Sequence, residues 1–425
     1  MKVLVVGGGG REHALCWALR NDLPSATLYC APGNPGTAEH AENLPIGSDK
    51  IDQIVGAANE FAVDLVVVGP EVPLARGLAD KLRAANRPVF GPSAAAARIE
   101  SSKAFAKEVM LAAGVPTAPS RSFTELAPAL AYVDRHEAPL VVKASGLAAG
   151  KGAIICASRE EARRALTQML RDGIFGEAGK TAVVESFLEG EEVSVLAVTN
   201  GRDLVILPAA QDHKRLEDRD RGPNTGGMGA YSPVSFATRE FLDRVERLVL
   251  IPTLAEMERR GAPFAGVLYA GLMVDERGNP NVVEFNCRFG DPEAQVILPL
   301  IASGFADLLH AVATRTALPK LEIASSAAVT TVLAAAGYPE TPRRGDPIAM
   351  PRQLPSGTMI FQAGTQRDDA GTLRTNGGRV MAVTGVAPTF AAAQAASRQG
   401  AESVVFAGKQ FRRDIGWREA RRQRV

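Results

Sequence analysis

Short apolar runs that stop at glycine open the chain. Residues 3–6 and residues 64–68 are two such runs, and each is followed by a stretch in which apolar side chains recur at helical spacing. Alternation of buried strands with helices predicts a parallel α/β sheet, whose glycine loops lie at the carboxyl ends of the strands where ligands bind. We expect residues 1–100 to form such a domain.

The pattern changes at two later points. From Ser101 a helix with one apolar face runs to Gly114, and residues 115–295 then mix strands and helices as α+β folds do. From about residue 325 the chain is rich in strand-like runs again. The arginine-rich residues 418–424 predict a frayed, solvated tail. We therefore expect three domains, at residues 1–100, 101–324 and 325–425.

Composition excludes several classes of protein. The chain has 48 basic and 47 acidic side chains, so its net charge of +1 gives no general attraction to nucleic acid or to a membrane surface. Its 4 cysteines lack the spacing of a disulfide framework or a zinc site, and no apolar stretch approaches the roughly 20 residues of a membrane span. We expect a cytoplasmic monomer that binds small molecules, with no nucleic acid or membrane partner.

A glycine-rich loop with two lysines follows a buried strand in residues 139–152. Lys143 interrupts the apolar run, and the loop that follows surrounds Lys151 with glycines. The glycines are Gly146, Gly150 and Gly152. Free backbone N–H groups together with ammonium charges predict a phosphate cradle, although the spacing is not that of a Walker loop. A hairpin turn with solvated lysines is the alternative.

The N-terminal glycine run resembles a dinucleotide-binding motif without completing it. Counted from Gly7, the motif requires a third glycine where Glu12 stands, so the sequence does not support an oxidoreductase. The glycines either bind a phosphate at the start of the following helix or form a tight turn.

Two oxygen-bearing side chains lie two residues apart in a predicted strand near residue 285. Glu284 and Asn286 should share one face of that strand, with Val283 and Phe285 pointing into the core. Mg²⁺ accepts few protein oxygens and completes its coordination with water and phosphate, so the pair is a candidate metal site. Ordinary surface polarity is the alternative. Further polar residues crowd the segment, namely Arg288, Asp291 and Glu293.

Two more segments carry charge in places that suit ligand binding. Residues 211–233 join a charged cluster that includes Asp212 and Lys214 to a glycine-rich stretch, which suits a substrate lid or a mobile solvated loop. Residues 184–192 either link two lobes and bind a nucleoside or form an acidic surface loop. No nucleophile motif or zinc-protease motif accompanies His213.

These segments, in this order, resemble the phosphoribosylamine-glycine ligase family of ATP-grasp enzymes along nearly the whole chain. The stretches that carry the resemblance are VVGGGGREHAL, VVGPEVPLARGLAD, FGPSAAAARIESSKAFAK, VVKASGLAAGKG, QDHKRLEDRDRGPNTGGMGAYSP, GVLYAGLMV, VEFNCRFGDPEAQ, TNGGRVMAVT and FRRDIG. The resemblance implies an α/β and α+β multidomain fold. Its parts are an N-terminal Rossmann-like parallel α/β domain, ATP-grasp lobes with a small lobe inserted at about residues 115–190, and a small β-rich C-terminal domain.

The resemblance also implies roles for individual residues. Those expected to bind ATP are Lys103, Lys143, Gly146, Gly150, Lys151, Gly152, Glu185, Leu188 and Glu192. Within this group, Lys103 and Lys143 would hold phosphates, Glu185 and Leu188 would contact adenine, and Glu192 would contact the ribose. The residues expected to hold glycine or the ribosylamine, and so to be catalytic, are Asp212, Lys214 and Arg288. Gly9 and the Gly69, Pro70 and Glu71 turn would face the sugar phosphate, and Glu284 with Asn286 would bind Mg²⁺ or Mn²⁺.

The implied reaction is ATP-dependent ligation of glycine to 5-phosphoribosylamine through glycyl phosphate, in purine synthesis. Three positions depart from the family pattern without removing an implied ligand, namely Ser145, Ser186 and Ala294. Two alternatives stay open: an ATP-grasp ligase or carboxylase with other substrates, and a nucleotide-binding regulator without catalysis.

Overall fold

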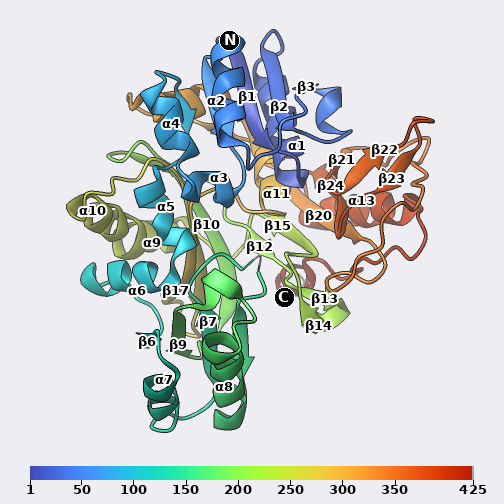
Figure 1. Ribbon diagram of the computed structural model, residues 1–425. Helices are drawn as coiled ribbons and strands as arrows, with labels where there is room; N and C mark the ends of the chain where they lie inside the picture. Colours follow the sequence, from blue (N-terminus) through green and yellow to red (C-terminus); the bar gives the residue numbers. More distant parts are fainter. Residues whose placement is uncertain (149, 424–425) are drawn as a thin grey trace.

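The computed structural model describes residues 1–148 and 150–423 and has the domain layout of Figure 1. The N-terminal domain lies at the top of that view, a small lobe at the bottom and the C-terminal domain at the right. The expected combination of a parallel α/β domain, ATP-grasp lobes and a β-rich C-terminal domain is confirmed. Among the described residues, none of the helices has both the length and the apolar character that a membrane crossing requires.

The N-terminal domain is a five-stranded parallel sheet. Its strands, in spatial order, are β3 (Glu42–Asn43), β2 (Thr27–Pro32), β1 (Lys2–Gly7), β4 (Leu65–Val68) and β5 (Val89–Phe90). Its helices are α1 (Gly10–Asp22), α2 (Ile51–Glu60), α3 (Glu71–Ala75), α4 (Leu78–Ala84) and α5 (Ala94–Ser101). The buried runs of β1 and β4 are the two apolar segments of the sequence, and their glycine-rich ends lie at one edge of the sheet.

The middle of the chain contains two four-stranded sheets. The larger is antiparallel, in the order β11 (Leu204–Ile206), β10 (Glu191–Thr199), β16 (Gly266–Val274) and β17 (Pro280–Asn286). The small lobe has the order β6 (Ser120–Phe123), β9 (Ala182–Ser186), β7 (Leu140–Ala144) and β8 (Ala153–Cys156). The helices of this region are α6 (Lys103–Ala112), α7 (Leu126–Val133), α8 (Arg159–Leu166), α9 (Arg239–Val245), α10 (Ile251–Arg259), α11 (Ala294–Ile297) and α12 (Phe305–Thr314).

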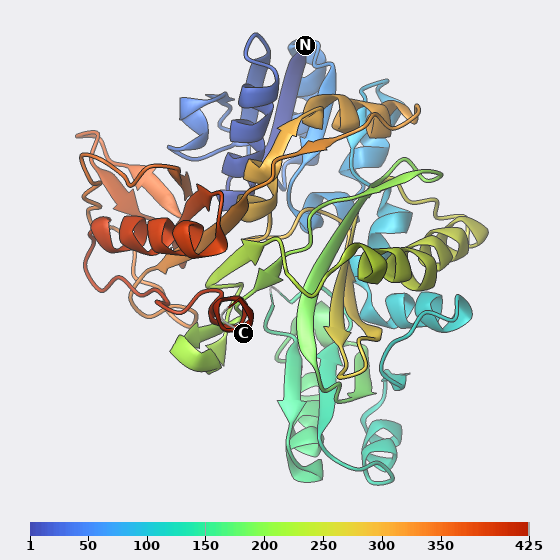
Figure 2. The same ribbon diagram turned by 180° about the vertical axis from the view of Figure 1, so that it is seen from behind.

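The C-terminal sheet draws strands from two parts of the sequence. Its order is β12 (Gln211–Asp212), β15 (Gly229–Ser232), β20 (Ala327–Ala334), β24 (Arg379–Ala387) and β21 (Thr358–Gln362). Helix α13 (Phe390–Ser403) lies along the face of this sheet in Figure 2. Because β12 and β15 precede residue 324, this sheet extends across the boundary that we expected there.

The hydrophobic cores show which domains form one packed body. One buried cluster joins Val3 of the N-terminal sheet to Val198 of the central sheet and Ala328 of the C-terminal sheet. The small lobe has a separate cluster of its own, which includes Val142 and Val184. The small lobe is therefore the part whose packing is most independent of the rest.

Three local expectations are corrected by the structure. The helical stretch that we expected after residues 64–68 is divided into α3 and α4 at Gly77, whose φ of +81° lies in the left-handed region. Residues 211–233 are not a structureless loop, because they contain β12, β15 and the short hairpin of β13 (Arg215–Glu217) and β14 (Arg221–Asn224).

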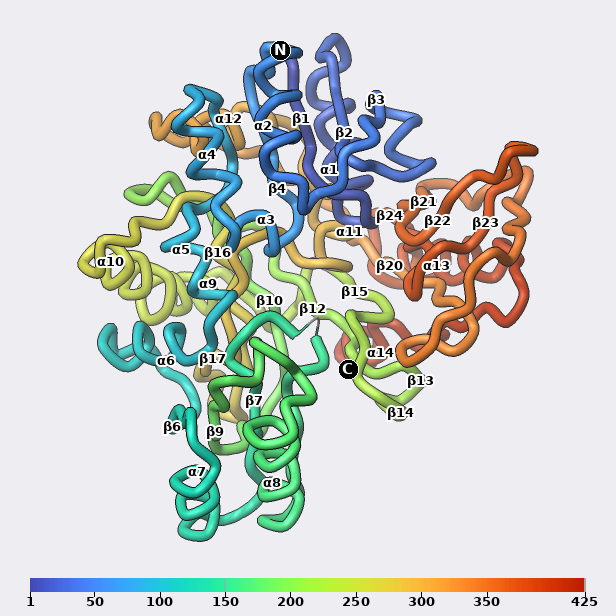
Figure 3. The backbone as a smooth tube through the Cα atoms, viewed as in Figure 1, coloured from blue at the N-terminus to red at the C-terminus, as the bar shows by residue number. Residues whose placement is uncertain are grey.

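The third correction concerns the arginine-rich end. Residues 417–422 are not a frayed tail, because they form the helix α14 (Trp417–Arg422), which lies beside β13 and β14 in Figure 3. An ion pair between Arg418 and Asp220, which lies between β13 and β14, ties the helix to that hairpin. Arg424, at the end of the predicted tail, lies outside the described residues.

Candidate active site between the lobes

A buried carboxylate joins the two ATP-grasp lobes. Glu185 on β9 is 4% exposed and forms an ion pair with Lys143 on β7. The same lysine donates a hydrogen bond to the carbonyl oxygen of Val283 on β17, at 3.1 Å. The Lys143 side chain therefore spans the gap between the small lobe and the central sheet.

Lys107 is a second cation on Glu185, and the sequence analysis missed it. Its Nζ lies 2.6 Å from Glu185 Oε2 and 2.7 Å from the hydroxyl oxygen of Thr117. Burial lowers the pKa of Lys107, and the attraction of Glu185 offsets part of that effect. The sequence feature that could have identified Lys107 is its spacing of four residues from Lys103, which places both lysines on one side of α6.

The glycine loop is attached to α6 through Ser145. The Ser145 carbonyl accepts a hydrogen bond from the Lys103 amide at 2.7 Å, and its hydroxyl accepts one from the Ala104 amide at 3.1 Å. A Cβ atom at Gly146 would lie 2.6 Å from the Ala178 backbone, so only glycine allows that close approach. At the far end of the loop, Lys151 Nζ donates to the Pro339 carbonyl of the C-terminal domain at 3.4 Å.

The candidate metal ligands lie on β17, next to a bulge. Gly271 pairs with Glu284 and Leu272 with Val282, so Val283 has no opposite residue in the ladder. Our expectation that Val283 points into the core is therefore wrong. Val282 takes the buried position, and Val283 lines a small cavity with Glu284.

Cations from both lobes surround Glu284. Burial by itself would raise the pKa of this carboxyl, but the neighbouring positive groups outweigh that effect and lower it below its usual value. These groups are Lys103, Lys214, Lys143 and Arg288. An ionised Glu284 beside the Asn286 amide oxygen offers two oxygen ligands from one strand, which fits a divalent cation such as Mg²⁺.

Arg288 lies in a cluster of carboxylates at the edge of this site. Its Nη2 is 2.8 Å from Glu100 Oε1 and 3.2 Å from Asn286 Oδ1, and its Nε is 3.3 Å from Glu71 Oε2. Glu71 thus brings one member of the predicted 69–71 turn to the site. Glycine is needed at position 69 for a steric reason, because a Cβ atom there would lie 2.1 Å from the Glu12 carboxylate.

The predicted substrate residue Lys214 lines the small cavity together with Glu284, and Asp212 lies near Lys214. Lys214 forms an ion pair with Glu192 on β10, so Glu192 contacts a predicted substrate residue as well. Burial, followed by repulsion from Glu293 and Glu192, raises the pKa of Asp212 to about 7 despite the attraction of Lys214. Leu188 lies half-buried in the linker between β9 and β10.

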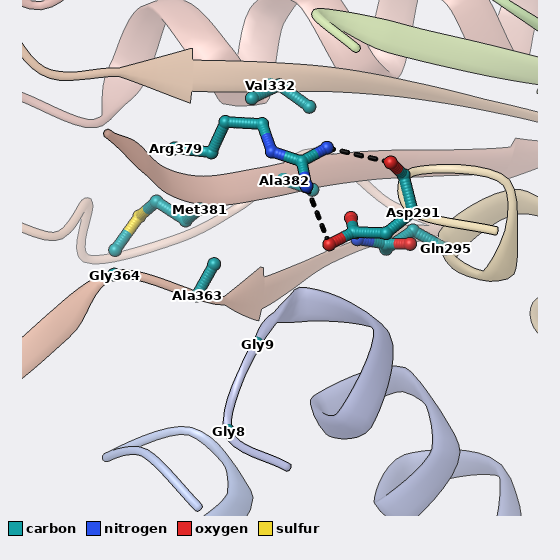
Figure 4. Close-up of a pocket in the computed structure, with 10 residues that line it drawn as sticks. All are labelled: Gly8, Gly9, Asp291, Gln295, Val332, Ala363, Gly364, Arg379, Met381 and Ala382. Carbon is teal, nitrogen blue, oxygen red and sulfur yellow. Dashed lines mark hydrogen bonds and ion pairs between the residues drawn. The ribbon is translucent and has the colours of Figure 1, made fainter. Parts of the chain in front are cut away.

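A larger cavity of about 320 Å³ lies where the three domains meet, and Figure 4 shows its lining. Arg379 on β24 faces Asp291, with Nη2 2.8 Å from Asp291 Oδ2, and its Nη1 donates to the Gly226 carbonyl at 2.6 Å. Gly9 also borders the cavity, but its amide already donates to Glu12 Oε2 at 2.6 Å. The amide at the tight turn is thus satisfied within the protein, and Arg379 supplies the cation of this cavity.

Sequence reasoning gave Arg379 no role, although TNGGRVMAVT was among the characteristic stretches. The available signal was a charged residue at the start of an otherwise apolar strand. Its partner Asp291 lies 88 positions away, so local pattern did not identify the pair.

Known protein families match nearly the whole chain. Models of phosphoribosylglycinamide synthetase match residues 1–100 (N domain), 101–294 (ATP-grasp (A) domain) and 328–418 (C domain). The phosphoribosylamine-glycine ligase of Ralstonia nicotianae is 47% identical over 99% of this chain and 100% of its own length. The crystal structure of phosphoribosylamine-glycine ligase from Thermotoga maritima is 35% identical, with a TM-score of 0.86 over 98% of this chain and 100% of that one.

A more distant relative shares the fold alone. The biotin carboxylase domain of 2-oxoglutarate carboxylase from Hydrogenobacter thermophilus is 19% identical, with a TM-score of 0.73 over 96% of this chain and 91% of that one.

The environment of Lys107 predicts an effect on nucleotide binding. In Lys107→Met, Glu185 keeps Lys143 as its counter-ion and holds it more tightly, so Lys143 is less available to phosphates. We expect the KM for ATP to rise about tenfold, which corresponds to about 1.4 kcal/mol. Steady-state kinetics with ATP varied would measure this, and Lys180→Met, at an exposed lysine of the small lobe, is the control. A folded Lys107→Met protein with an unchanged KM for ATP would refute the idea.

Proposed function

This chain belongs to the phosphoribosylglycinamide synthetase family, and on that premise we propose which of its residues bind each substrate and act in each step of the reaction. The chain is an ATP-dependent ligase that joins glycine to 5-phosphoribosylamine in purine synthesis. The observation that supports our assignment of the catalytic centre is the position of Glu284, which has cations from both lobes around it.

ATP occupies the space between the lobes in this proposal. Lys103 and Lys143 hold its phosphates beneath the glycine loop of residues 146–152, which includes Gly150, Lys151 and Gly152. Lys143 exchanges part of its contact with Glu185 for the phosphates, and Lys107 remains to balance the charge of that carboxylate. Glu185 and Leu188 border the adenine, and Glu192 the ribose.

Glu284 and Asn286 hold the divalent cation, Mg²⁺ or Mn²⁺, in this proposal. Bound there, the cation would neutralise charge on the phosphates of ATP. The residues themselves supply an ionised carboxylate, an amide oxygen and a ring of lysines that favours anionic groups.

The first chemical step activates glycine. A carboxylate oxygen of glycine attacks the γ-phosphorus of ATP, the bond from that phosphorus to the bridging oxygen breaks, and ADP leaves with glycyl phosphate as the product. Lys103, Lys143 and Arg288 stabilise the charge on the transferring group, because catalysis of phosphoryl transfer is mainly positioning and electrostatics. The ammonium group of glycine lies against Asp212 in this assignment.

The second step forms the amide. The amine of 5-phosphoribosylamine attacks the carbonyl carbon of glycyl phosphate, the carbon–oxygen bond to phosphate breaks, and the amine loses one proton as inorganic phosphate leaves. In this assignment Lys214 and Arg288 face the reacting carboxyl group of glycyl phosphate. No covalent bond to the protein is needed.

We place the sugar phosphate of 5-phosphoribosylamine in the 320 Å³ cavity, against Arg379. A guanidinium suits a phosphate because it donates two parallel hydrogen bonds, and Asp291 suits ribose hydroxyl groups. Gly9 and the 69–71 turn, including Pro70, border the sugar in this arrangement. The chain acts on these small molecules as a monomer without a nucleic acid partner in our proposal, which its mass in solution would test.

The catalytic centre is tested by phosphate release. We expect release from ATP to require glycine, 5-phosphoribosylamine and Mg²⁺ together, and Glu284→Gln to lower it about 100-fold, as loss of a transition-state electrostatic contact does. Binding of Mn²⁺, followed by electron paramagnetic resonance, should weaken in the same variant. Glu276→Gln, an exposed residue in the turn before β17, is the control. Release without glycine, or with another acid in its place, would favour a different ATP-grasp ligase.

The sugar-phosphate cavity is tested by Arg379→Gln. We expect the KM for 5-phosphoribosylamine to rise about 10-fold to 100-fold, because charge-assisted contacts to phosphate are among the stronger hydrogen bonds. The KM for ATP should stay the same, since the nucleotide lies between the lobes. Arg374→Gln removes a cation of the same domain outside the cavity and serves as control. Equal effects of the two variants on this KM would contradict the placement of the sugar phosphate in this cavity.

The raised pKa of Asp212 predicts a pH dependence. Below about pH 7 this carboxyl is protonated and neutral, so it no longer attracts the glycine ammonium group. We expect kcat/KM for glycine to fall by about tenfold for each pH unit below that value. In Asp212→Asn the value should be low and no longer show this inflection. Persistence of the same inflection in the variant would assign it to another group.

A further inference from the structure

The C-terminal segment, residues 410–422, is bonded to the segment that carries two proposed substrate residues. The Arg412 side chain is fully buried, at 0% exposed, and its Nη1 lies 2.7 Å from Asp220 Oδ1 and 3.2 Å from the Arg215 carbonyl. Its Nε and Nη2 lie 2.8 and 2.9 Å from the two oxygens of Asp414. One buried guanidinium thus joins the β13–β14 hairpin to the end of the chain.

Backbone contacts follow the same path. The Arg413 amide donates to Asp218 at 2.9 Å, and the Arg219 amide donates to Asp414 at 2.7 Å. Arg219 and Asp220 have φ values of 59° and 54°, in the left-handed region that residues other than glycine rarely adopt. Such a backbone persists where its surroundings hold it, and here Arg412 pairs with Asp220 itself.

The contact reaches the substrate residues directly. The Gly416 amide donates to Nε2 of His213 at 3.0 Å. His213 is buried, and in the sequence it stands between Asp212 and Lys214. The position of this imidazole therefore sets the backbone on which both charged residues lie.

Helix α14 holds the opposite side of the same charge cluster. Arg422 forms an ion pair with Glu191, the residue before Glu192 on β10. Gln211 Nε2 donates to Glu191 Oε1 at 2.8 Å and to the Glu192 carbonyl at 2.6 Å. Glu419, 1% exposed, accepts a hydrogen bond from Arg422 at 3.1 Å and so orients it.

We propose that the C-terminal segment supports the substrate site, and that Arg412 and Arg422 are positioning residues for Asp212 and Lys214. This inference rests on the proposed function, because it takes Asp212 and Lys214 as the residues that hold glycine and the ribosylamine. Three charged groups packed together have several ways to pair. In the structure Lys214 meets Glu192 and Asp212 remains available to a ligand, and we infer that the two arginines favour this arrangement.

The test compares Arg412→Gln and Arg422→Gln with Arg421→Gln, an exposed arginine of the same helix. We expect the KM for glycine and for 5-phosphoribosylamine to rise tenfold or more in the first two, with the KM for ATP within twofold of the parent chain. The kcat/KM inflection near pH 7 should move as well, because the neighbours of Asp212 change. Arg412→Lys keeps the charge and should recover part of the loss.

Two further measurements keep the outcome decisive. Arg412→Gln removes the fully buried guanidinium that joins Asp220 to Asp414 and risks unfolding, whereas the Arg422 side chain is 28% exposed and its loss is milder. A folded Arg422→Gln protein with all three KM values unchanged would overturn the inference, and so would an equal rise in the KM for ATP. Lys214→Met distinguishes failure of the proposed function from failure of this inference. If the variant leaves the KM for glycine and for 5-phosphoribosylamine unchanged, the proposed function fails. If it raises both values while the arginine variants do not, only the inference fails.

Discussion

Pairing of the buried Glu185 carboxylate with two lysines is the constraint on which the proposed nucleotide cleft depends. A buried carboxylate is stable only with cations beside it, and here the cations come from different elements, Lys107 from α6 and Lys143 from β7. Lys143 also bonds to β17, the strand that carries Glu284. The small lobe is therefore positioned over the proposed metal ligands by charge pairing, while its own hydrophobic cluster remains separate.

This division of packing has a consequence for function. The N-terminal, central and C-terminal sheets share buried clusters, so the cavity at their junction is bordered by parts that form one body. The small lobe keeps a separate buried cluster and is joined to that body by polar links such as those of Lys107 and Lys143, which rearrange at lower cost than a packed core. In our proposal ATP binds where the structure is held by exchangeable ion pairs, and the ribosylamine binds where the structure is firmly packed.

The fold by itself does not decide the substrates. A biotin carboxylase domain at 19% identity shares it, and an ATP-grasp cleft with lysines and acidic ligands would serve either reaction. In our proposal the distinction lies in the groups around the cleft, namely the Asp212–Lys214 segment and Arg379. Both belong to strands of the C-terminal sheet or to the segment between them, and the end of the chain holds that segment in place.

The sequence by itself determined the features that depend on local order. Apolar runs ending at glycine predicted the parallel sheet, the spacing of Glu284 and Asn286 placed them on one strand, and the ordered stretches identified the family. Only the tertiary structure decided the bulge at Val283, the sharing of Glu185 between two lysines, and the helix at residues 417–422 that we had expected to be a frayed tail. It also paired Arg379 with Asp291 and Arg412 with Asp220, across 88 and 192 positions. Periodicity reports the faces of single elements, whereas a buried charge is matched by whichever element the fold brings beside it.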